Sequence, residues 1–361
     1  MRITKLHIFD RCLLLGAPGI GKTEIVKQKA QEEAKKRERE FIDLRDRIPE
    51  DVFEKPERYY VFYRVVAPHV FPEDLALPRA HDRFVEFIPP RVLSVLSVPG
   101  IEGVLFIDEL TNVQRDDQMS MFFSLILEKE AGWMLKLSDG IKIIAAANTS
   151  EWSEIARALP KPLRNRMTVI SVDPPTVDEW ISYMHSRYGD QWDTVTAAYL
   201  KANEQDFIKP PADDDGFSAF PTPRSWTNVA IMVHRFRDAD DEFIEEVVVG
   251  NLGREVGAKL LALMRTRINV AEVLEGLKTN PSMFSGLSVN ERILVINAFA
   301  SVSAEKLRDY QKFVEYMAEH DRDYLMISVM LMDRSKRAKF FGTFTKVMQK
   351  VAGDISRYLY G

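Results

Sequence analysis

Near its amino end the chain reads Cys12-Leu13-Leu14-Leu15-Gly16-Ala17-Pro18-Gly19-Ile20-Gly21-Lys22-Thr23-Glu24. An apolar run comes first, and a glycine-rich loop follows it directly. Glycines let the backbone N–H groups of such a loop turn inward around phosphates, where a Cβ would obstruct the approach. Lys22 would neutralise the β- and γ-phosphates, Thr23 would place its hydroxyl on Mg²⁺, and the helix that starts there would direct its positive end at the same anion. Residues 16–24 are therefore predicted to bind a nucleoside triphosphate.

The composition indicates a soluble protein of more than one domain. The chain has 361 residues, 46% of them hydrophobic, which suggests two or three domains with buried cores. Its net charge is −5, so the surface as a whole lacks the basic character of proteins that bind nucleic acid through many phosphates. The start has no apolar signal segment and no long apolar run follows, so we expect a cytoplasmic protein without a membrane partner. The single cysteine, Cys12, excludes an intrachain disulfide and is expected to be a buried, inert thiol.

Alternation of strands and helices in the first half predicts an α/β fold with a mostly parallel sheet. We expect strands at residues 12–15, 59–67, 104–107 and 141–147, with helices at 24–40 and 116–129. In such sheets, ligands bind at the carboxyl ends of the strands. The glycine-rich loop, Asp108 and Asn148 all follow strands at such ends.

The second half is predicted to be helical, with segments at about 226–236, 243–264 and 271–278 and a last helical block over 289–360. Residues 210–216 are acidic and contain proline, which favours a surface loop over a metal site. Trp133 and Trp152 flank the strand at 141–147 and are expected to pack or to lie on a pore hairpin, rather than to stack on bases.

Two carboxylates end the apolar run at 104–107, in the order Asp108 and Glu109. Asp108 would hold Mg²⁺ through its water shell, and Glu109 would polarise the water that attacks the γ-phosphate. Neighbouring residues of an extended chain point to different sides, so the two carboxylates can serve different partners. The alternative is that they only cap a helix.

Three more polar positions complete the pattern. Asn148 ends the strand at 141–147, where its amide would hydrogen-bond the γ-phosphate and the attacking water, although Asn also caps helices. Arg164 and Arg166 lie in Leu163-Arg-Asn-Arg-Met167, just before the apolar Val169-Ile170. Taken alone, the two arginines are equally compatible with an ordinary surface.

The order of these motifs, together with Pro221-Thr-Pro-Arg-Ser225, resembles that of AAA+ ATPases, in particular their MoxR-like branch. The resemblance covers about residues 11–265. The branch assignment rests on Pro72-Glu-Asp-Leu-Ala-Leu-Pro78, Val85-Glu-Phe-Ile-Pro-Pro90 and Glu128-Lys-Glu-Ala-Gly132. The AAA+ resemblance implies a nucleotide-binding core over residues 1–172 and a helical lid over 173–268. A helical C-terminal region of unknown role follows over 269–361.

By the same resemblance Asn148 is the sensor 1 residue, Arg166 the arginine finger with Arg164 as its alternative, and Arg224 the sensor 2 arginine on a lid helix. The bland alternative for Arg224 is a helix-start arginine capped by Ser225 or packed on Trp226. AAA+ members work as rings, usually hexameric, in which the finger of one subunit reaches the γ-phosphate held by its neighbour. A homo-oligomer that binds ATP and Mg²⁺ and hydrolyses the ATP is therefore expected.

The MoxR-like resemblance implies a chaperone-like remodeller of protein complexes, whose partner often carries a von Willebrand factor A domain. Two other functions remain open. A nucleic-acid motor or loader is disfavoured by the acidic net charge. A nucleotide-gated scaffold with little turnover is disfavoured by the presence of Glu109 and Arg166.

Overall fold

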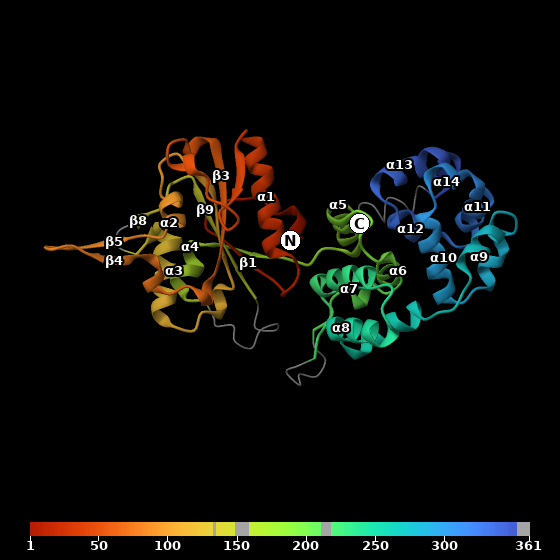
Figure 1. Ribbon diagram of the computed structural model, residues 1–361. Helices are drawn as coiled ribbons and strands as arrows, with labels where there is room; N and C mark the ends of the chain where they lie inside the picture. Colours follow the sequence, from red (N-terminus) through yellow and green to blue (C-terminus); the bar gives the residue numbers. More distant parts are fainter. Residues whose placement is uncertain (133–134, 149–158, 211–217, 352–361) are drawn as a thin grey trace. The chain divides into compact units, whose positions relative to one another are not determined.

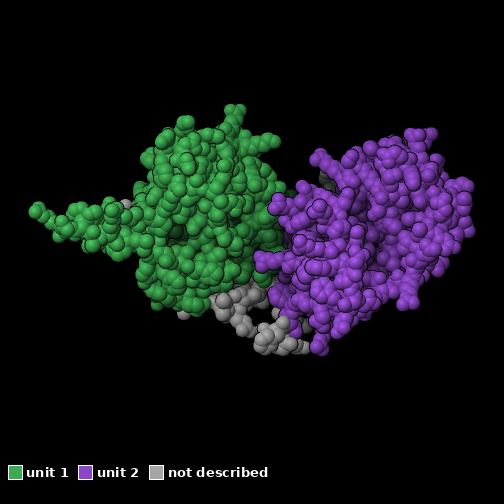
Figure 2. Space-filling model, viewed as in Figure 1, with its two compact units in different colours: residues 1–174 green, residues 175–361 purple. Residues whose placement is uncertain are grey.

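The computed structural model describes residues 1–132, 135–148, 159–210 and 218–351. The chain forms two compact units, Met1–Pro174 and Pro175–Gly361, which Figure 2 draws in green and purple. Each unit has its own hydrophobic core. Trp133, Trp152 and the acidic residues 213–215 lie outside the described residues.

Unit 1 is built on a six-stranded sheet in the order β10-β1-β9-β6-β3-β2, and every strand pair in it is parallel. The order places β9 between β1 and β6, so residues distant in sequence end at the same edge. Figure 1 labels β1, β3 and β9 of this sheet. Their bounds are β1 Cys12–Leu15, β2 Glu40–Asp43, β3 Tyr59–Val66, β6 Glu102–Asp108, β9 Ile141–Ala147 and β10 Thr168–Ser171.

Helices cover both faces of this sheet, which explains why its inner strands are largely apolar on both sides. Helix α1 (Lys22–Lys36) packs on β2, β3 and β6 through its buried residues Val26, Ala30 and Ala34. The opposite face shares a core with α2 (Arg91–Leu96) and α3 (Asp116–Glu128), and α4 (Lys161–Arg166) packs on α3 (Figure 1). The parallel sheet flanked by helices that the sequence predicted is thus confirmed.

The strands expected from the sequence are present within one or two residues at each end. The expected helix 24–40 is wrong at its end, because α1 stops at Lys36 and residues Glu40–Asp43 form the edge strand β2. The chain turns at Glu38, which has a left-handed φ of 56°, and the Arg39 N–H donates back to the Ala34 carbonyl at 3.0 Å. Because charged residues continue past this turn, the sequence gives no clear signal for the end of the helix.

The described part of unit 1 also contains two small hairpins, of which the larger was not predicted from the sequence. The larger pairs β4 (Leu77–Ala80) with β5 (Val85–Ile88), and it projects from the unit in Figures 1 and 2. The smaller pairs β7 (Glu130–Ala131) with β8 (Leu135–Lys136). Short 3₁₀ segments connect the elements of unit 1, namely η1 Ile3–Lys5, η2 Glu50–Phe53, η3 Pro56–Arg58, η4 Ala67–His69, η5 Pro72–Leu75 and η6 Leu110–Asn112.

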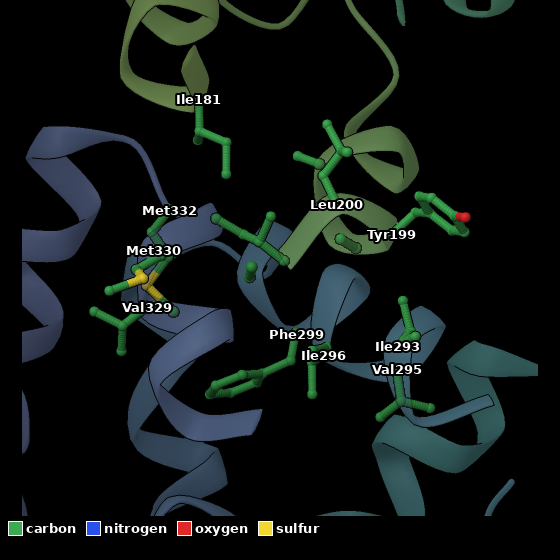
Figure 3. Packing of buried hydrophobic residues seen from close by; sticks show 14 of the residues in the cluster. Ile181, Tyr199, Leu200, Ile293, Val295, Ile296, Phe299, Val329, Met330 and Met332 are labelled. Atoms are coloured by element: carbon green, nitrogen blue, oxygen red, sulfur yellow. The ribbon is translucent and has the colours of Figure 1, made fainter. Parts of the chain in front are cut away.

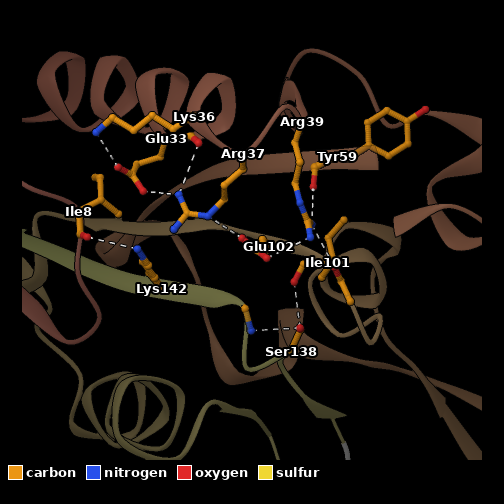
Figure 4. Close-up of polar contacts among 12 residues, drawn as sticks. Ile8, Glu33, Lys36, Arg37, Arg39, Tyr59, Ile101, Glu102, Ser138 and Lys142 are labelled. Atoms are coloured by element: carbon orange, nitrogen blue, oxygen red, sulfur yellow. Dashed lines mark hydrogen bonds and ion pairs between the residues drawn. The ribbon is translucent and has the colours of Figure 1, made fainter. Parts of the chain in front are cut away.

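A polar network joins the strands at their amino ends, which we call the amino edge of the sheet (Figure 4). Glu102, the first residue of β6, pairs with Arg37 at 2.9 Å and with Arg39 at 3.0 Å. Arg39 also donates to the carbonyls of Tyr59 at 3.3 Å and Gly100 at 3.1 Å. Both oxygens of the Glu102 carboxylate are thereby neutralised far from the carboxyl edge of the same strand.

Unit 2 is helical. Its α-helices are α5 Val177–Tyr188, α6 Thr194–Ala202, α7 Pro223–Arg235, α8 Asp241–Met264, α9 Val270–Leu277, α10 Val289–Ser301, α11 Gln311–His320, α12 Arg322–Leu331, α13 Arg334–Thr343 and α14 Thr345–Lys350. The 3₁₀ segments are η7 Glu204–Asp206, η8 Pro281–Gly286 and η9 Ala304–Tyr310. A kink at Gly253, with φ 75° and ψ 167°, interrupts α8. Glycine fits this position because an added Cβ would lie 2.5 Å from the Ala219 carbonyl oxygen.

One continuous core runs through unit 2. Figure 3 shows side chains of α5, α6, α10 and α12 converging on it, among them Leu200, Phe299 and Val329. The helices expected at 226–236, 243–264 and 271–278 are present with shifts of a few residues. The segments expected from the sequence as lid (173–268) and C-terminal region (269–361) contribute to this same core. None of the helices in the described part of the chain combines the length and apolar character that a bilayer span requires.

Candidate active site

The glycine-rich loop leaves the sheet between two neighbouring strands. It starts where β1 ends, and the Gly16 N–H donates to the Ala147 carbonyl of β9 at 3.4 Å. Gly19 and Gly21 have φ of 72° and 90°, in the left-handed region that other residues avoid. Gly21 immediately precedes α1, so the loop leads directly into the N-terminus of that helix. The backbone therefore has the shape that anion binding at a helix start requires.

Lys22 turns its ammonium back into the loop. Its Nζ donates to the carbonyl oxygens of Gly16 at 2.7 Å and Ala17 at 2.9 Å, and to Oδ1 of Asn148 at 2.9 Å. The residue is only 8% exposed. Because β9 lies next to β1, Asn148 reaches the loop although it is 126 positions away. The lysine and the candidate sensor are thus in direct contact.

Thr23 and Asp108 form the second contact across the site. The Thr23 Oγ1 donates to Oδ2 of Asp108 at 2.9 Å. Asp108 ends β6, and its side chain is 10% exposed. The hydroxyl and the carboxylate predicted to serve one Mg²⁺ are therefore within hydrogen-bond distance of each other.

Arg64 is part of this site, and the sequence analysis missed it. Its Nε and Nη2 both donate to Oδ2 of Asp108, at 3.0 and 2.8 Å. Arg64 lies on β3 opposite Phe106 of β6, so its side chain shares a face of the sheet with Asp108. The signal was a single cation inside the otherwise apolar run Tyr59–Val66.

Glu109 adjoins the site, but its carboxylate has a different partner. Its φ of 58° and ψ of 35° form a left-handed turn at the end of β6, and its N–H donates to Oδ1 of Asp108 at 3.0 Å. The Asn112 amide donates to Oε2 of Glu109 at 3.3 Å. Glu109 precedes η6 without making a capping hydrogen bond through its side chain, so the capping alternative is not observed for it. The two carboxylates thus have different hydrogen-bond partners.

The candidate finger and sensor 2 arginines lie on helices outside the glycine-rich loop. Arg166 ends α4, is 59% exposed at its side chain, and lies 3.7 Å from the Glu128 carboxylate. Arg164 is exposed on the same helix. Arg224 is the second residue of α7 in unit 2 and is exposed, whereas the next tryptophan, Trp226, is fully buried. Thr222, rather than Ser225, is the N-cap of α7, accepting from the Ser225 N–H at 3.2 Å.

The thiol next to the loop is buried. Cys12 is fully buried in β1, and burial raises its pKa to about 12. A thiol with such a pKa stays protonated and is a poor nucleophile. The expected burial of the cysteine is confirmed, and its inertness stays a prediction.

The residues at this edge fit a magnesium-bound triphosphate. Mg²⁺ prefers oxygen ligands, keeps several waters, and is usually held by one or two carboxylates together with substrate phosphates. Thr23 and Asp108 supply such oxygens, and Lys22 supplies a cation for phosphate. Within the described residues, no group of three or more His, Cys, Asp or Glu is placed to hold a metal ion. A metal at Asp108 would therefore need phosphate and water oxygens to complete its shell.

We expect Gly16→Ala to lower the free energy of unfolding by about 1–3 kcal/mol, the usual cost of overpacking. A Cβ at this position would lie 2.6 Å from the Val172 carbonyl oxygen and 2.9 Å from its Cγ2. Val172 cannot retreat easily, because its N–H donates to the Leu15 carbonyl at 2.7 Å. Urea denaturation followed by circular dichroism measures the effect.

Gly342→Ala is the control for this substitution. Gly342 lies in α13, where no atom comes within 4 Å of an added Cβ. Alanine there improves helix propensity, so stability should hold or rise slightly. Equal denaturation midpoints for Gly16→Ala and the unmodified protein would contradict the steric argument.

Comparison with known proteins yields structural likeness only. No family model and no curated protein sequence matches the chain. Among solved structures, the chain is similar to NtrX from Brucella abortus in complex with ADP, at 14% identity and a TM-score of 0.36, covering 99% of this chain and 66% of that one. A RuvB mutant from Thermotoga maritima matches at 16% identity and a TM-score of 0.32, covering 86% and 82%.

Hsp104 with ATPγS and FITC casein is a third similar structure, at 16% identity and a TM-score of 0.37, covering 86% of this chain and 48% of that one. This chain thus spans about two thirds of the NtrX chain and about half of the Hsp104 chain. ADP is a ligand of that NtrX structure, and ATPγS and FITC casein are ligands of that Hsp104 structure. The architecture of this chain, taken from its own strand order, is a parallel sheet flanked by helices and followed by a helical region.

Proposed function

We propose that this protein is a Mg²⁺-dependent ATPase of the AAA+ type, which acts as a ring-forming, chaperone-like remodeller of protein complexes. The observation that carries the ATPase part is the meeting of four side chains at the carboxyl edge of one sheet. Lys22 contacts Asn148, and Thr23 contacts Asp108, over 126 and 85 positions of sequence. This is the set of a lysine, a hydroxyl, a carboxylate and an amide that phosphoryl-transfer sites use.

Lys22 would hold the terminal phosphates. In the structure its ammonium is bound to neutral carbonyl and amide oxygens. Phosphate oxygens are anionic and form stronger charge-assisted hydrogen bonds, so they would replace these acceptors without any large movement of the lysine. The N-terminus of α1 would add its positive end to the same phosphates.

Thr23 and Asp108 would orient the metal, the hydroxyl as a ligand and the carboxylate through a bound water. When present, Mg²⁺ would supply the charge that neutralises the phosphates. Glu109 would take the proton of the attacking water, and its carboxylate accepts from Asn112, a partner that the Asp108 carboxylate does not use. Asn148 would hydrogen-bond the γ-phosphate that Lys22 holds beside it.

Arg166 would act across a subunit boundary as the arginine finger, with Arg164 as the alternative. An arginine so placed stabilises charge that grows in the transition state. The exposure of Arg166 and its loose ion pair with Glu128 support this role, because the guanidinium is accessible to a neighbouring copy. Arg224, at the exposed start of α7, would contribute the sensor 2 cation.

The β4–β5 hairpin supports contact with a protein client. Leu77, Phe84, Val85 and Ile88 are between 41% and 69% exposed on it. An isolated two-stranded hairpin is marginally stable in water and gains from a covering partner. Apolar side chains fit a protein partner better than a phosphate backbone, which agrees with the net charge of −5. The client would be captured there, and the MoxR-like resemblance suggests a partner with a von Willebrand factor A domain.

Glu109→Gln tests the catalytic assignment. We expect ATP to bind normally while hydrolysis falls by roughly 10²–10⁴-fold, the range that a general base contributes. Binding is measured with a fluorescent ATP analogue, and turnover by phosphate release at several protein concentrations, with and without DNA.

Glu57→Gln is the matched control, since Glu57 is an exposed carboxylate at the amino edge of the sheet, before β3. It should hydrolyse ATP at the rate of the unmodified protein. Normal turnover by Glu109→Gln would assign the proton transfer to another residue. Stimulation of turnover by DNA would favour the motor or loader instead of the protein remodeller.

A further inference from the structure

Strand β6 carries an arginine–carboxylate pair at each of its ends. At the amino edge Glu102 is held by Arg39, with Arg37 beside it. At the carboxyl edge Asp108 is held by Arg64 at 2.8 Å. The first pair lies away from the glycine-rich loop. The second uses the very carboxylate oxygen that also accepts from Thr23.

The oxygens of Asp108 are already engaged before any ligand is added. Oδ2 accepts two N–H groups of Arg64 and the hydroxyl of Thr23, and Oδ1 accepts the N–H of Glu109. A guanidinium is charged at every accessible pH, so it compensates the charge of this carboxylate for as long as the two are in contact. A divalent cation brought to the same oxygens meets both the occupied acceptors and the repulsion of the guanidinium.

We propose that Arg64 is an internal counter-ion of Asp108 that competes with Mg²⁺ for this carboxylate, so that loading of the metal–nucleotide complex requires the Arg64 guanidinium to leave. The inference rests on the proposed function, because it concerns the metal of the same site. It makes Arg64 a positioning residue that acts through Asp108.

The contacts of Arg64 allow such a release. Its side chain is 31% exposed, whereas that of Asp108 is 10% exposed, so the arginine has access to solvent and the aspartate stays in place. Its departure without a replacement would leave a largely buried, unpaired carboxylate, which is costly. Entry of the metal removes that cost. Release and metal binding are therefore coupled.

Arg64→Gln tests the competition, with Arg39→Gln as the matched control at the other end of β6. Binding of a fluorescent ATP analogue is titrated over a series of free Mg²⁺ concentrations and in EDTA. For Arg64→Gln we expect the half-effective Mg²⁺ concentration to fall by roughly fivefold or more, the lower end of typical coupling between linked equilibria. For Arg39→Gln it should not change.

A second titration uses Mn²⁺ alone, followed by electron paramagnetic resonance without nucleotide. We expect Arg64→Gln to bind Mn²⁺ more tightly than the unmodified protein. This measurement keeps the two proposals apart. If the unmodified protein binds no nucleotide, the ATPase proposal fails, and the Mn²⁺ titration still decides the role of Arg64.

Two results would overturn the counter-ion role. An unchanged metal requirement in both titrations would leave Arg64 a structural ion pair. Weaker nucleotide binding in EDTA as well as in Mg²⁺ would make it a phosphate ligand. If Arg64→Gln does not fold, the test uses nuclear magnetic resonance of the unmodified protein. The Nε–H resonance of Arg64 is assigned by its loss in Arg64→Lys. It should shift when Mg²⁺ and nucleotide are added together, and an unmoved resonance would refute the proposal.

Discussion

Lys22→Ala should weaken ATP binding by roughly 100-fold or more, because each hydrogen bond to a charged group contributes about 1.5–3 kcal/mol and the ammonium would make several to the phosphates. The structure places this ammonium inside the loop, on the carbonyls of Gly16 and Ala17 and the amide of Asn148. Titration calorimetry with Mg·ATP measures the loss.

Lys36→Ala is the control for this prediction. Lys36 is the last residue of the same helix, with a side chain 68% exposed, and its pair with Glu33 is a surface contact of little energetic weight. Thermal unfolding of both variants separates lost binding from lost stability. If a folded Lys22→Ala protein still binds ATP tightly, the glycine-rich loop is not the triphosphate site.

Arg166→Ala should reduce ATP turnover by about 10³-fold or more, the contribution of an arginine finger, while leaving ATP bound. In the proposed ring the finger would act on the nucleotide of a neighbouring subunit, so another subunit could supply the missing arginine in trans. A mixture of Arg166→Ala and Lys22→Ala proteins should therefore recover part of the activity. At some boundaries, a subunit with an intact loop would face a subunit with an intact finger.

A mixture of Lys22→Ala and Glu109→Gln proteins is the control for complementation. Both substitutions damage the half that holds the nucleotide, so every boundary in the mixed ring keeps its finger but lacks an intact nucleotide-binding half, and activity should not return. If the Arg166→Ala mixture stays inactive while a mixture of Lys22→Ala with an inactive Arg164→Ala protein recovers activity, the finger is Arg164. A purified protein that stays monomeric in saturating Mg·ATP and hydrolyses it rapidly would contradict the ring itself.

The sequence predicted those features that depend on neighbours in the chain. The apolar runs that became β1, β3, β6 and β9 were recognisable because strands covered by helices on both faces are continuously apolar. The end of α1 was not, since the charges of Arg37 to Glu40 fit a solvated helix as well as a turn followed by an edge strand. The β4–β5 hairpin was missed because its exposed apolar residues lack the alternation of a half-buried strand.

The same division runs through the candidate site. Local spacing alone identified the loop, Thr23, Asp108 and Asn148, because a glycine turn and polar residues at strand ends are properties of short segments. Only the tertiary structure decided which of these residues contact one another, because strand order depends on long-range packing that no short segment encodes. It placed β9 between β1 and β6, bringing Asn148 to Lys22. It also set β3 beside β6 in the register that puts Arg64 on Asp108.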